Sequence, residues 1–133
     1  MICADSSSMV AYFQGEPGRD VELVDQALAA GLLVLAPASI AELLSYPDLN
    51  PSLASSLLEI VQLEIIAGYW ERVGRLRALL FRHRLRPKLA GSLIAQSCLD
   101  HGVALVTRDR DFAGFQRFAG LRLQGLEPGI PQL

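Results

Sequence analysis

The stretch KLAGSLIAQSCLDHGVALVTRDRDF (residues 88–112) decides the fold, because it joins a helical pattern to a strand pattern in one short unit. Residues 88–101 carry apolar side chains at helical spacing, and VALVT (103–107) is apolar and rich in β-branched residues, as buried strands are. A polar turn that begins at Thr107 follows. The stretch therefore predicts a helix, a buried strand and a polar loop, in that order.

The same alternation runs through the rest of the chain. Strands are expected at 1–4, 32–36, 61–67, 103–107 and 121–124, and helices at 7–14, 20–30, 38–45, 52–60, 69–84 and 88–101. Strands that alternate with helices indicate right-handed crossovers and a parallel sheet covered by helices. We therefore expect an α/β fold. The length suits a single core, so residues 1–133 are expected to form one domain.

The composition is that of a globular protein, with 51% hydrophobic and 20% charged residues, which excludes a disordered chain. The sequence contains no run of 18 apolar residues, so we expect no membrane span. The first residues, MICADSSSM, lack the basic region of a signal peptide. Cys3 and Cys98 lie in apolar or helical runs, which predicts free thiols and a cytoplasmic location.

Basic side chains gather in the second half of the chain. Residues 71–133 hold 11 of the 12 Lys and Arg residues, and 5 of the 14 Asp and Glu residues. Seven of the basic residues lie between positions 72 and 88. Such a cluster is either a solvated helix face or a surface that binds the phosphates of a nucleic acid. Charge alone leaves both interpretations open.

Three acids follow predicted strands at their carboxyl ends, where parallel α/β sheets bind their ligands. Asp5 follows the first strand, Glu42 comes shortly after the second, and Asp109 follows the fourth. Each acid has a structural alternative, namely a helix cap, a solvated helix position or a turn. Together they indicate a site for a hard cation, because Mg²⁺ prefers carboxylate and water oxygens.

Three stretches carry a family resemblance: residues 88–112 quoted above, ADSSSMVAYFQGE (4–16) and PASIAELLSYP (37–47). Together they resemble the PIN-domain ribonucleases, and within them the VapC-type toxins of bacterial toxin–antitoxin pairs. The resemblance runs from residue 2 to about residue 123. It implies an α/β/α sandwich with a mainly parallel sheet of about five strands, a homodimer, and an antitoxin partner. It also implies RNA cleavage with Mg²⁺ or Mn²⁺. A phosphoacceptor receiver domain shares the sheet architecture, but its acid after the third strand and its lysine after the fifth are missing.

The resemblance assigns roles to particular residues. Asp5, Glu42 and Asp109 match the catalytic, metal-binding acids. The residues that match supporting positions are Ser7, Thr107 and Asp111. The residues expected to hold the RNA backbone are Arg72, Arg75, Arg82, Arg84, Arg86, Lys88 and Arg108. Contacts of this kind go to phosphates and carry little sequence information.

Gly91 stands where the resemblance predicts a third acid, in the first turn of a helix. An aspartate there would be favoured by the helix dipole and could reach a metal, and glycine offers neither benefit. We therefore expect weak or absent cleavage, and a PIN-like module that binds RNA or an antitoxin without cutting is the alternative. Apolar residues that could form an antitoxin groove, or else pack in the core, are Leu44, Tyr46, Leu53 and Leu57.

Overall fold

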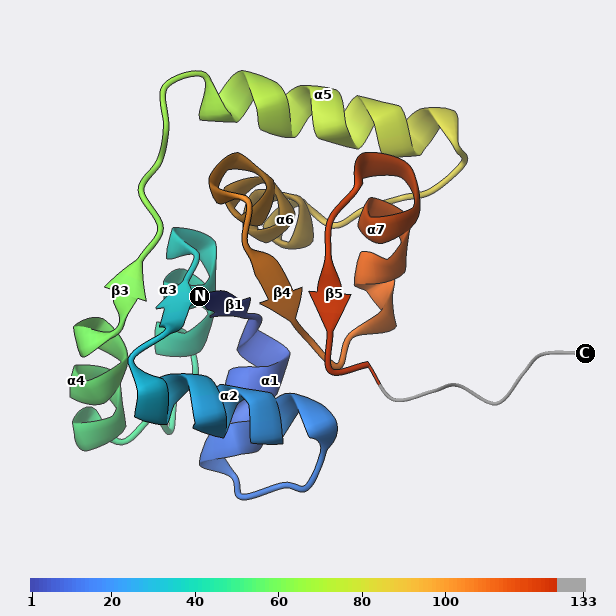
Figure 1. Cartoon of the computed structure of the whole chain (residues 1–133). Coiled ribbons are helices and arrows are strands. Elements are labelled where there is room, and N and C mark those ends of the chain that lie inside the picture. Colours follow the sequence, from blue (N-terminus) through green and yellow to red (C-terminus); the bar gives the residue numbers. More distant parts are fainter. Residues whose placement is uncertain (127–133) are drawn as a thin grey trace, which may run out of the picture.

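The computed structural model describes residues 1–126, so residues 127–133 of the expected domain lie outside the described part. In chain order the elements are β1 (Ile2–Ala4), α1 (Ser6–Phe13), α2 (Arg19–Ala30), β2 (Leu33–Leu35), α3 (Pro37–Leu44), α4 (Pro51–Glu59), β3 (Val61–Gln62), α5 (Tyr69–Arg82), α6 (Leu89–His101), β4 (Ala104–Val106), the 3₁₀ helix η1 (Arg110–Phe112), α7 (Ala113–Ala119) and β5 (Leu123–Gln124) (Figure 1). Within residues 1–126, no helix is both long and apolar enough to span a bilayer.

The five strands form one parallel sheet in the order β3-β2-β1-β4-β5. Ile2 of β1 aligns with Leu33 of β2 on one side and with Ala104 of β4 on the other. The first strand of the sequence therefore lies at the centre of the sheet. Since all strands run the same way, their carboxyl ends share one edge of the sheet.

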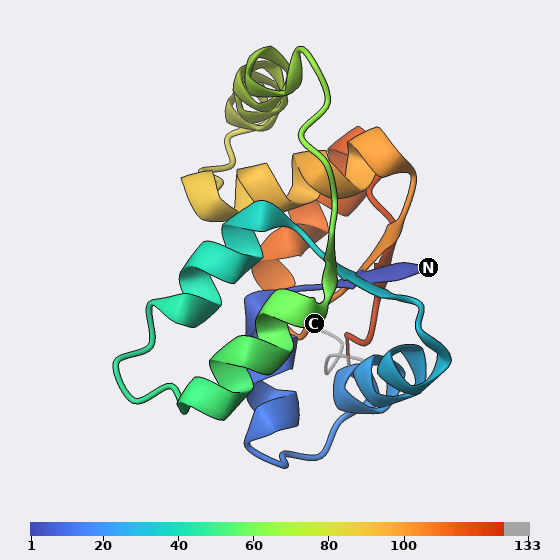
Figure 2. The same cartoon turned by 90° about the vertical axis from the view of Figure 1, so that its left-hand side faces the viewer.

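Helices cover both faces of the sheet, as the two views show (Figures 1 and 2). Cys3 and Leu105 belong to a buried cluster with side chains from α5, α6 and α7. The adjoining residues Ala4 and Val106 belong to a second cluster, with side chains from α1, α2, α3 and α4. This alternation is the period of two that a strand imposes. It produces the α/β/α sandwich that the sequence predicts.

Two elements differ from the prediction. The third strand is only Val61–Gln62, not 61–67, because the chain leaves the sheet after the Leu63 amide donates to the Leu35 carbonyl at 2.9 Å. Helix α7 was not expected from the sequence, where Gly114 is a poor helix former. That glycine makes room for α5 and its following turn, since a β-carbon there would lie 2.7 Å from Cδ1 of Leu85.

Candidate functional site

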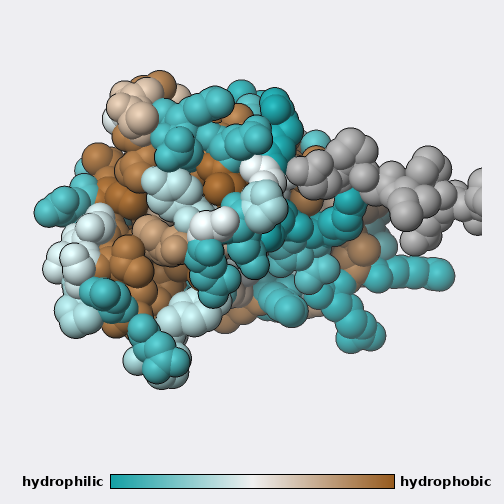
Figure 3. All heavy atoms as spheres, turned by 90° about the horizontal axis from the view of Figure 1, so that it is seen from below, coloured by the Kyte–Doolittle hydropathy of each residue, from teal (hydrophilic) through white to brown (hydrophobic). Residues whose placement is uncertain are grey.

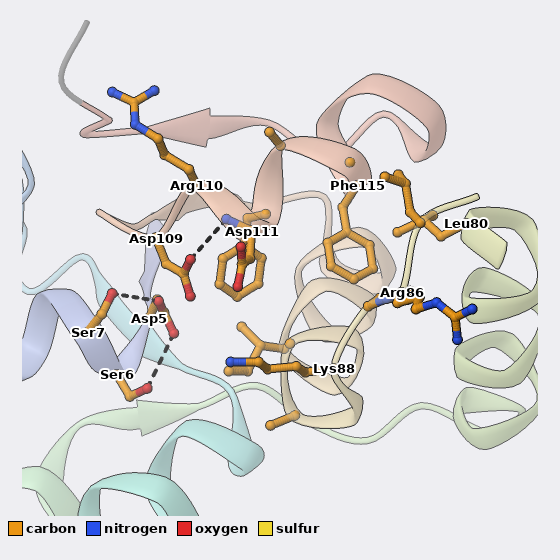
Figure 4. A pocket seen from close by; sticks show the side chains of 18 of the residues that line it. Asp5, Ser6, Ser7, Leu80, Arg86, Lys88, Asp109, Arg110, Asp111 and Phe115 are labelled. Atoms are coloured by element: carbon orange, nitrogen blue, oxygen red, sulfur yellow. Dashed lines mark hydrogen bonds between the residues drawn. The ribbon is translucent and has the colours of Figure 1, made fainter. Parts of the chain in front are cut away.

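A cavity of about 480 Å³ opens at the carboxyl edge of the sheet. Asp5, Glu42 and Asp109 all line it, and so does Gly91 in the first turn of α6 (Figure 4). Asp111 and Ser7 also belong to its wall. The structure therefore brings the three predicted acids and the exceptional glycine to one place, although they come from four separate segments of the chain.

Asp5 is the most constrained of the three acids. It is 3% exposed, and its Oδ2 accepts hydrogen bonds from Ser7 Oγ at 2.7 Å and from Thr107 Oγ1 at 2.8 Å. Asp5 occupies the N-cap position of α1, yet its side chain makes no capping hydrogen bond. The two hydroxyls therefore hold one carboxylate oxygen in place, and the group is not committed to helix capping.

The ionised form of Asp5 is disfavoured in the folded protein. Burial raises the pKa of Asp5, the hydrogen bonds from Ser7 and Thr107 lower it in part, and the nearby charge of Asp109 raises it further. The net result is a pKa above the ordinary value. A buried carboxylate beside a second acid is costly without a cation, so this arrangement is typical of functional sites.

Ser6 connects Asp5 with Glu42. Its hydroxyl donates to Glu42 Oε1 at 2.9 Å and lies 3.4 Å from Asp5 Oδ1. Sequence reasoning gave Ser6 no role in the site, because a serine at a helix start is ordinarily a capping residue. Its position directly after a strand-end acid is the signal that could have identified it.

Asp109 is held in place by hydrogen bonds of both its backbone amide and its carboxylate. Its amide donates to Thr107 Oγ1 at 3.0 Å, and its Oδ1 accepts from the Asp111 amide at 2.9 Å, which caps η1. Thr107 therefore contacts two of the three acids: its hydroxyl hydrogen is donated to Asp5, and its hydroxyl oxygen accepts from the Asp109 amide. Asp111 is exposed and reaches this network through its backbone amide.

The donor atoms of the cavity are those that a hard cation prefers. Among residues 1–126, no three His, Cys, Asp or Glu side chains stand close enough together to bind a metal ion directly. Mg²⁺ usually retains several water molecules and takes one or two protein carboxylates. The carboxylates at this edge therefore fit an ion held partly through water.

Gly91 leaves space for a side chain. A β-carbon there would lie 3.8 Å from the nearest ring atoms of Phe112 and 4.0 Å from Phe115, which is ordinary van der Waals contact. The first turn of α6 contains no acid. The cavity could thus accommodate a side chain at this position, and the chain does not supply one.

The basic residues fall into two groups. Arg86 and Lys88 line the cavity, where Figure 4 shows Lys88 reaching toward Asp5 and Arg86 pointing away from the acids. Arg75 on α5, and Arg82 and Arg84 at its end, are exposed. These five side chains border the cavity or the helix beside it, so they are still candidates for contact with RNA.

Arg72 and Arg108 are engaged elsewhere. Arg72 forms two hydrogen bonds with Asp100, at 2.8 and 2.7 Å, and a third with the Ala67 carbonyl. Arg108 contacts Asp20 through Nε at 2.8 Å and Glu16 through Nη1 at 2.8 Å. Their expected place on an RNA-binding surface is not supported, because carboxylates of the same chain already occupy both guanidinium groups.

The expected apolar groove is present in part. Leu44 and Tyr46 are exposed by 42% and 51%, and Leu53 is half-buried. Leu57 takes the other alternative, because this side chain of α4 is fully buried in the core. Seen from below, apolar side chains gather toward the side where α4 lies and hydrophilic ones toward the opposite side (Figure 3).

Comparisons with known proteins agree with this architecture. VapBC2 from Rickettsia felis, solved with a DNA fragment from its promoter, is similar with a TM-score of 0.69 and 22% identity, covering 96% of this chain and 100% of that one. VapBC-1 from nontypeable Haemophilus influenzae gives 0.69 and 21%, covering 94% and 98%. A toxin–antitoxin complex from Klebsiella pneumoniae gives 0.61 and 21%, covering 86% and 92%.

A search among curated protein sequences gives no significant match. The family comparison does, since residues 2–119 match the PIN domain and so take in both Asp5 and Asp109. The match extends over most of the chain and includes every strand except β5. The chain therefore belongs to the PIN-domain family.

Proposed function

We propose that this chain is the toxin of a type II toxin–antitoxin pair and acts in the cytoplasm as a metal-dependent endoribonuclease formed by one domain. The observation that supports this most is the cavity in which the buried Asp5 meets Glu42 and Asp109. Capping of η1 accounts for one oxygen of Asp109 only, and the Asp5 side chain makes no capping hydrogen bond. Membership of the PIN-domain family adds to the proposal.

In this proposal Asp5, Glu42 and Asp109 bind Mg²⁺ or Mn²⁺, directly or through water. When bound, the ion would activate a water molecule and stabilise negative charge on the phosphate. Ser7 and Thr107 hold Oδ2 of Asp5, whereas Oδ1 has only the longer contact of 3.4 Å with the Ser6 hydroxyl among these side chains. Ser6 would keep Glu42 at a fixed distance from Asp5.

The RNA backbone would lie along the turn between α5 and α6. The exposed basic residues at this turn and on α5 are Arg75, Arg82, Arg84, Arg86 and Lys88. Phosphate contacts of this kind position the strand without reading its sequence. Lys88 is the residue closest to the acids in this group, since it directly precedes α6 and reaches into the cavity (Figure 4).

The partners would be a second copy of the chain and an antitoxin. The similar structures named above include VapBC pairs and a toxin–antitoxin complex, which supports an antitoxin partner. The exposed Leu44 and Tyr46 are candidates for its contact surface.

A binding module without catalytic activity is the second candidate, and Gly91 favours it. Losing one anionic ligand weakens metal binding, and the described acids do not form a closed cluster. Such a chain would still grip RNA or an antitoxin through the same surfaces.

Restoring the third acid distinguishes the two. Purified chain, Gly91→Asp and the neutral, nearly isosteric control Gly91→Asn are compared in RNA-cleavage assays with Mg²⁺, with Mn²⁺ and with EDTA. We expect weak cleavage by the unchanged chain, with more in Mn²⁺ than in Mg²⁺. Cleavage should rise strongly in Gly91→Asp, stay weak in Gly91→Asn, and disappear in EDTA.

Two results would change the proposal. Equal, EDTA-sensitive cleavage by all three proteins would show that the third acid is dispensable. Failure of every protein to cut any RNA tested, while RNA binding persists, would leave the binding module as the function.

A further inference from the structure

A second polar cluster lies next to the candidate site, and Arg108, in the chain segment that follows β4, belongs to it. Its centre is Asp20, which is 2% exposed. Asp20 Oδ2 accepts from Ser8 Oγ at 2.7 Å and from Arg108 Nε at 2.8 Å, while Oδ1 accepts from Arg108 Nη2 at 3.1 Å. Arg108 also reaches Glu16 at 2.8 Å and the Pro17 carbonyl at 3.2 Å. The guanidinium group is thus held by four oxygen atoms.

Two glycines make this close packing possible. A β-carbon at Gly18 would lie 2.6 Å from Asp20 Oδ1 and 2.9 Å from Arg108 Nη2. A β-carbon at Gly125 would lie 2.8 Å from the β-carbon of Asp20 and 2.9 Å from its Cα. These separations are all too short for non-bonded atoms, so any other residue at either position would displace Asp20 or Arg108. The backbone is therefore built around this ion pair.

The cluster is connected to the acids through the backbone. Arg108 stands between Thr107, which donates to Asp5, and Asp109, whose amide donates to Thr107. We infer that the Asp20–Arg108 ion pair is a positioning device, which holds the Thr107–Asp109 turn against Asp5 and so sets the geometry of the metal site. The inference rests on the proposed function for its catalytic meaning, but the positioning can be tested without it.

The chemistry of the pair suits this task. Bidentate contacts between arginine and a carboxylate fix orientation as well as distance. Burial alone raises the pKa of Asp20, but the hydrogen bonds from Arg108 and Ser8 together outweigh it, so the pKa lies below its ordinary value. Asp20 therefore remains charged in the folded protein at neutral pH, and its ion pair with Arg108 persists.

The decisive variant is Asp20→Asn, which keeps the shape and removes the charge. Arg108 then retains Glu16, so no buried charge is left unpaired. The double variant Asp20→Asn/Arg108→Met removes both charges and guards against misfolding, since stranded buried charges are what destabilise most. Arg108→Lys tests rescue by a residue that keeps the charge but not the fork. Asp100→Asn, which breaks the ion pair with Arg72 outside the cavity lining, is the control.

Two measurements are made on the full chain. The first is the Kd for Mn²⁺, which should rise about tenfold in Asp20→Asn and in the double variant, as when other outer contacts of metal sites are removed. Arg108→Lys should lie between, and Asp100→Asn should match the unchanged chain. The second is amide hydrogen exchange, where protection of the Asp109 amide should fall about tenfold relative to that of Leu105 in the preceding strand β4.

The two measurements separate the possible failures. If the unchanged chain binds no Mn²⁺, the proposed metal site is refuted. The positioning role of the Asp20–Arg108 pair is then decided by the protection of the Asp109 amide relative to that of Leu105. If protection at Asp109 and Leu105 falls by the same factor, or not at all, and Mn²⁺ affinity is unaltered, the ion pair serves general stability and the positioning role is refuted.

Discussion

Thr107 donates its hydroxyl hydrogen to Oδ2 of Asp5 at 2.8 Å, across 102 residues of sequence, and the same hydroxyl oxygen accepts from the Asp109 amide at 3.0 Å. One buried hydroxyl thereby joins the ends of two neighbouring strands and two of the three acids of the cavity. The Thr107 hydroxyl therefore uses both its donor and its acceptor capacity on residues of the site.

Replacing this hydroxyl by a methyl group tests its contribution to stability. Thr107→Val keeps the shape but leaves Asp5 with one donor fewer, and hydrogen bonds to charged groups contribute about 1.5–3 kcal/mol. We expect the free energy of unfolding at pH 7 to fall by about this amount, measured by urea denaturation. The exposed Ser45, which bonds within its own helix end, provides the control Ser45→Ala, expected to change stability by less than about 0.5 kcal/mol. Equal effects of the two variants would contradict this account of Thr107.

Removing the charge of Asp5 should stabilise the metal-free protein. The pKa of Asp5 is raised above the value of 3.8 for a free side chain, so the unfolded chain ionises first as the pH increases. Stability is therefore lost as the pH rises from 3.8 through the folded pKa. In EDTA at pH 7, Asp5→Asn should therefore raise Tm, and each kcal/mol gained shifts Tm by about 3–5 °C in a domain of this size.

The advantage of Asp5→Asn should vanish below the unfolded pKa, because the carboxyl is then protonated in both states. Mn²⁺ should narrow the difference at pH 7, since an ion that binds the native state alone stabilises it. A lower Tm for Asp5→Asn than for the unchanged chain at pH 7 in EDTA would show that the carboxylate is not penalised by its burial.

The glycine next to Asp20 can be tested against a matched partner. Gly125 and Gly120 both have positive φ, of 88° and 77°, but a β-carbon at Gly125 meets Asp20 while one at Gly120 meets nothing within 4 Å. Both Gly125→Ala and Gly120→Ala bear the cost of a left-handed backbone, about 1–2 kcal/mol. Gly125→Ala should lose at least about 1 kcal/mol more in thermal unfolding, as overpacked sites do. Equal losses would mean that Asp20 can move freely.

Salt dependence can identify which arginines bind RNA. Neutralising Arg82, Arg84 and Arg86 together as glutamines should lower the slope of log Kd against log salt by about 0.7 for each phosphate that is no longer bound, measured in EDTA on a single strand. Arg72→Gln should leave the slope unchanged although it breaks the pair with Asp100 and destabilises the fold. If the triple variant keeps the original slope, the basic turn serves another ligand or none.

The sequence was most informative where chemistry follows a strand. Asp5 and Asp109 could be placed at one edge because parallel strands end together, whereas Gly91 was assigned to the same site by the family resemblance. The Asp20–Arg108 pair could not be foreseen, since 88 residues separate its members and each resembles a solvated charge in isolation. Helix α7 was not predicted because Gly114 weakens its local helical pattern. The reason for that glycine is its close approach to Leu85, which only the three-dimensional structure reveals.

The central position of β1 has a consequence for how the protein is made. Asp5 emerges early from the ribosome, but β4, one of the two strands that flank β1, and the Thr107 donor belong to the last third of the sequence. Because pairings this distant form late in folding, a partly synthesised chain has no completed cavity. Under the proposed ribonuclease activity, this order of assembly would spare the message and the ribosome that are producing the chain. Truncated products of interrupted translation would be harmless for the same reason.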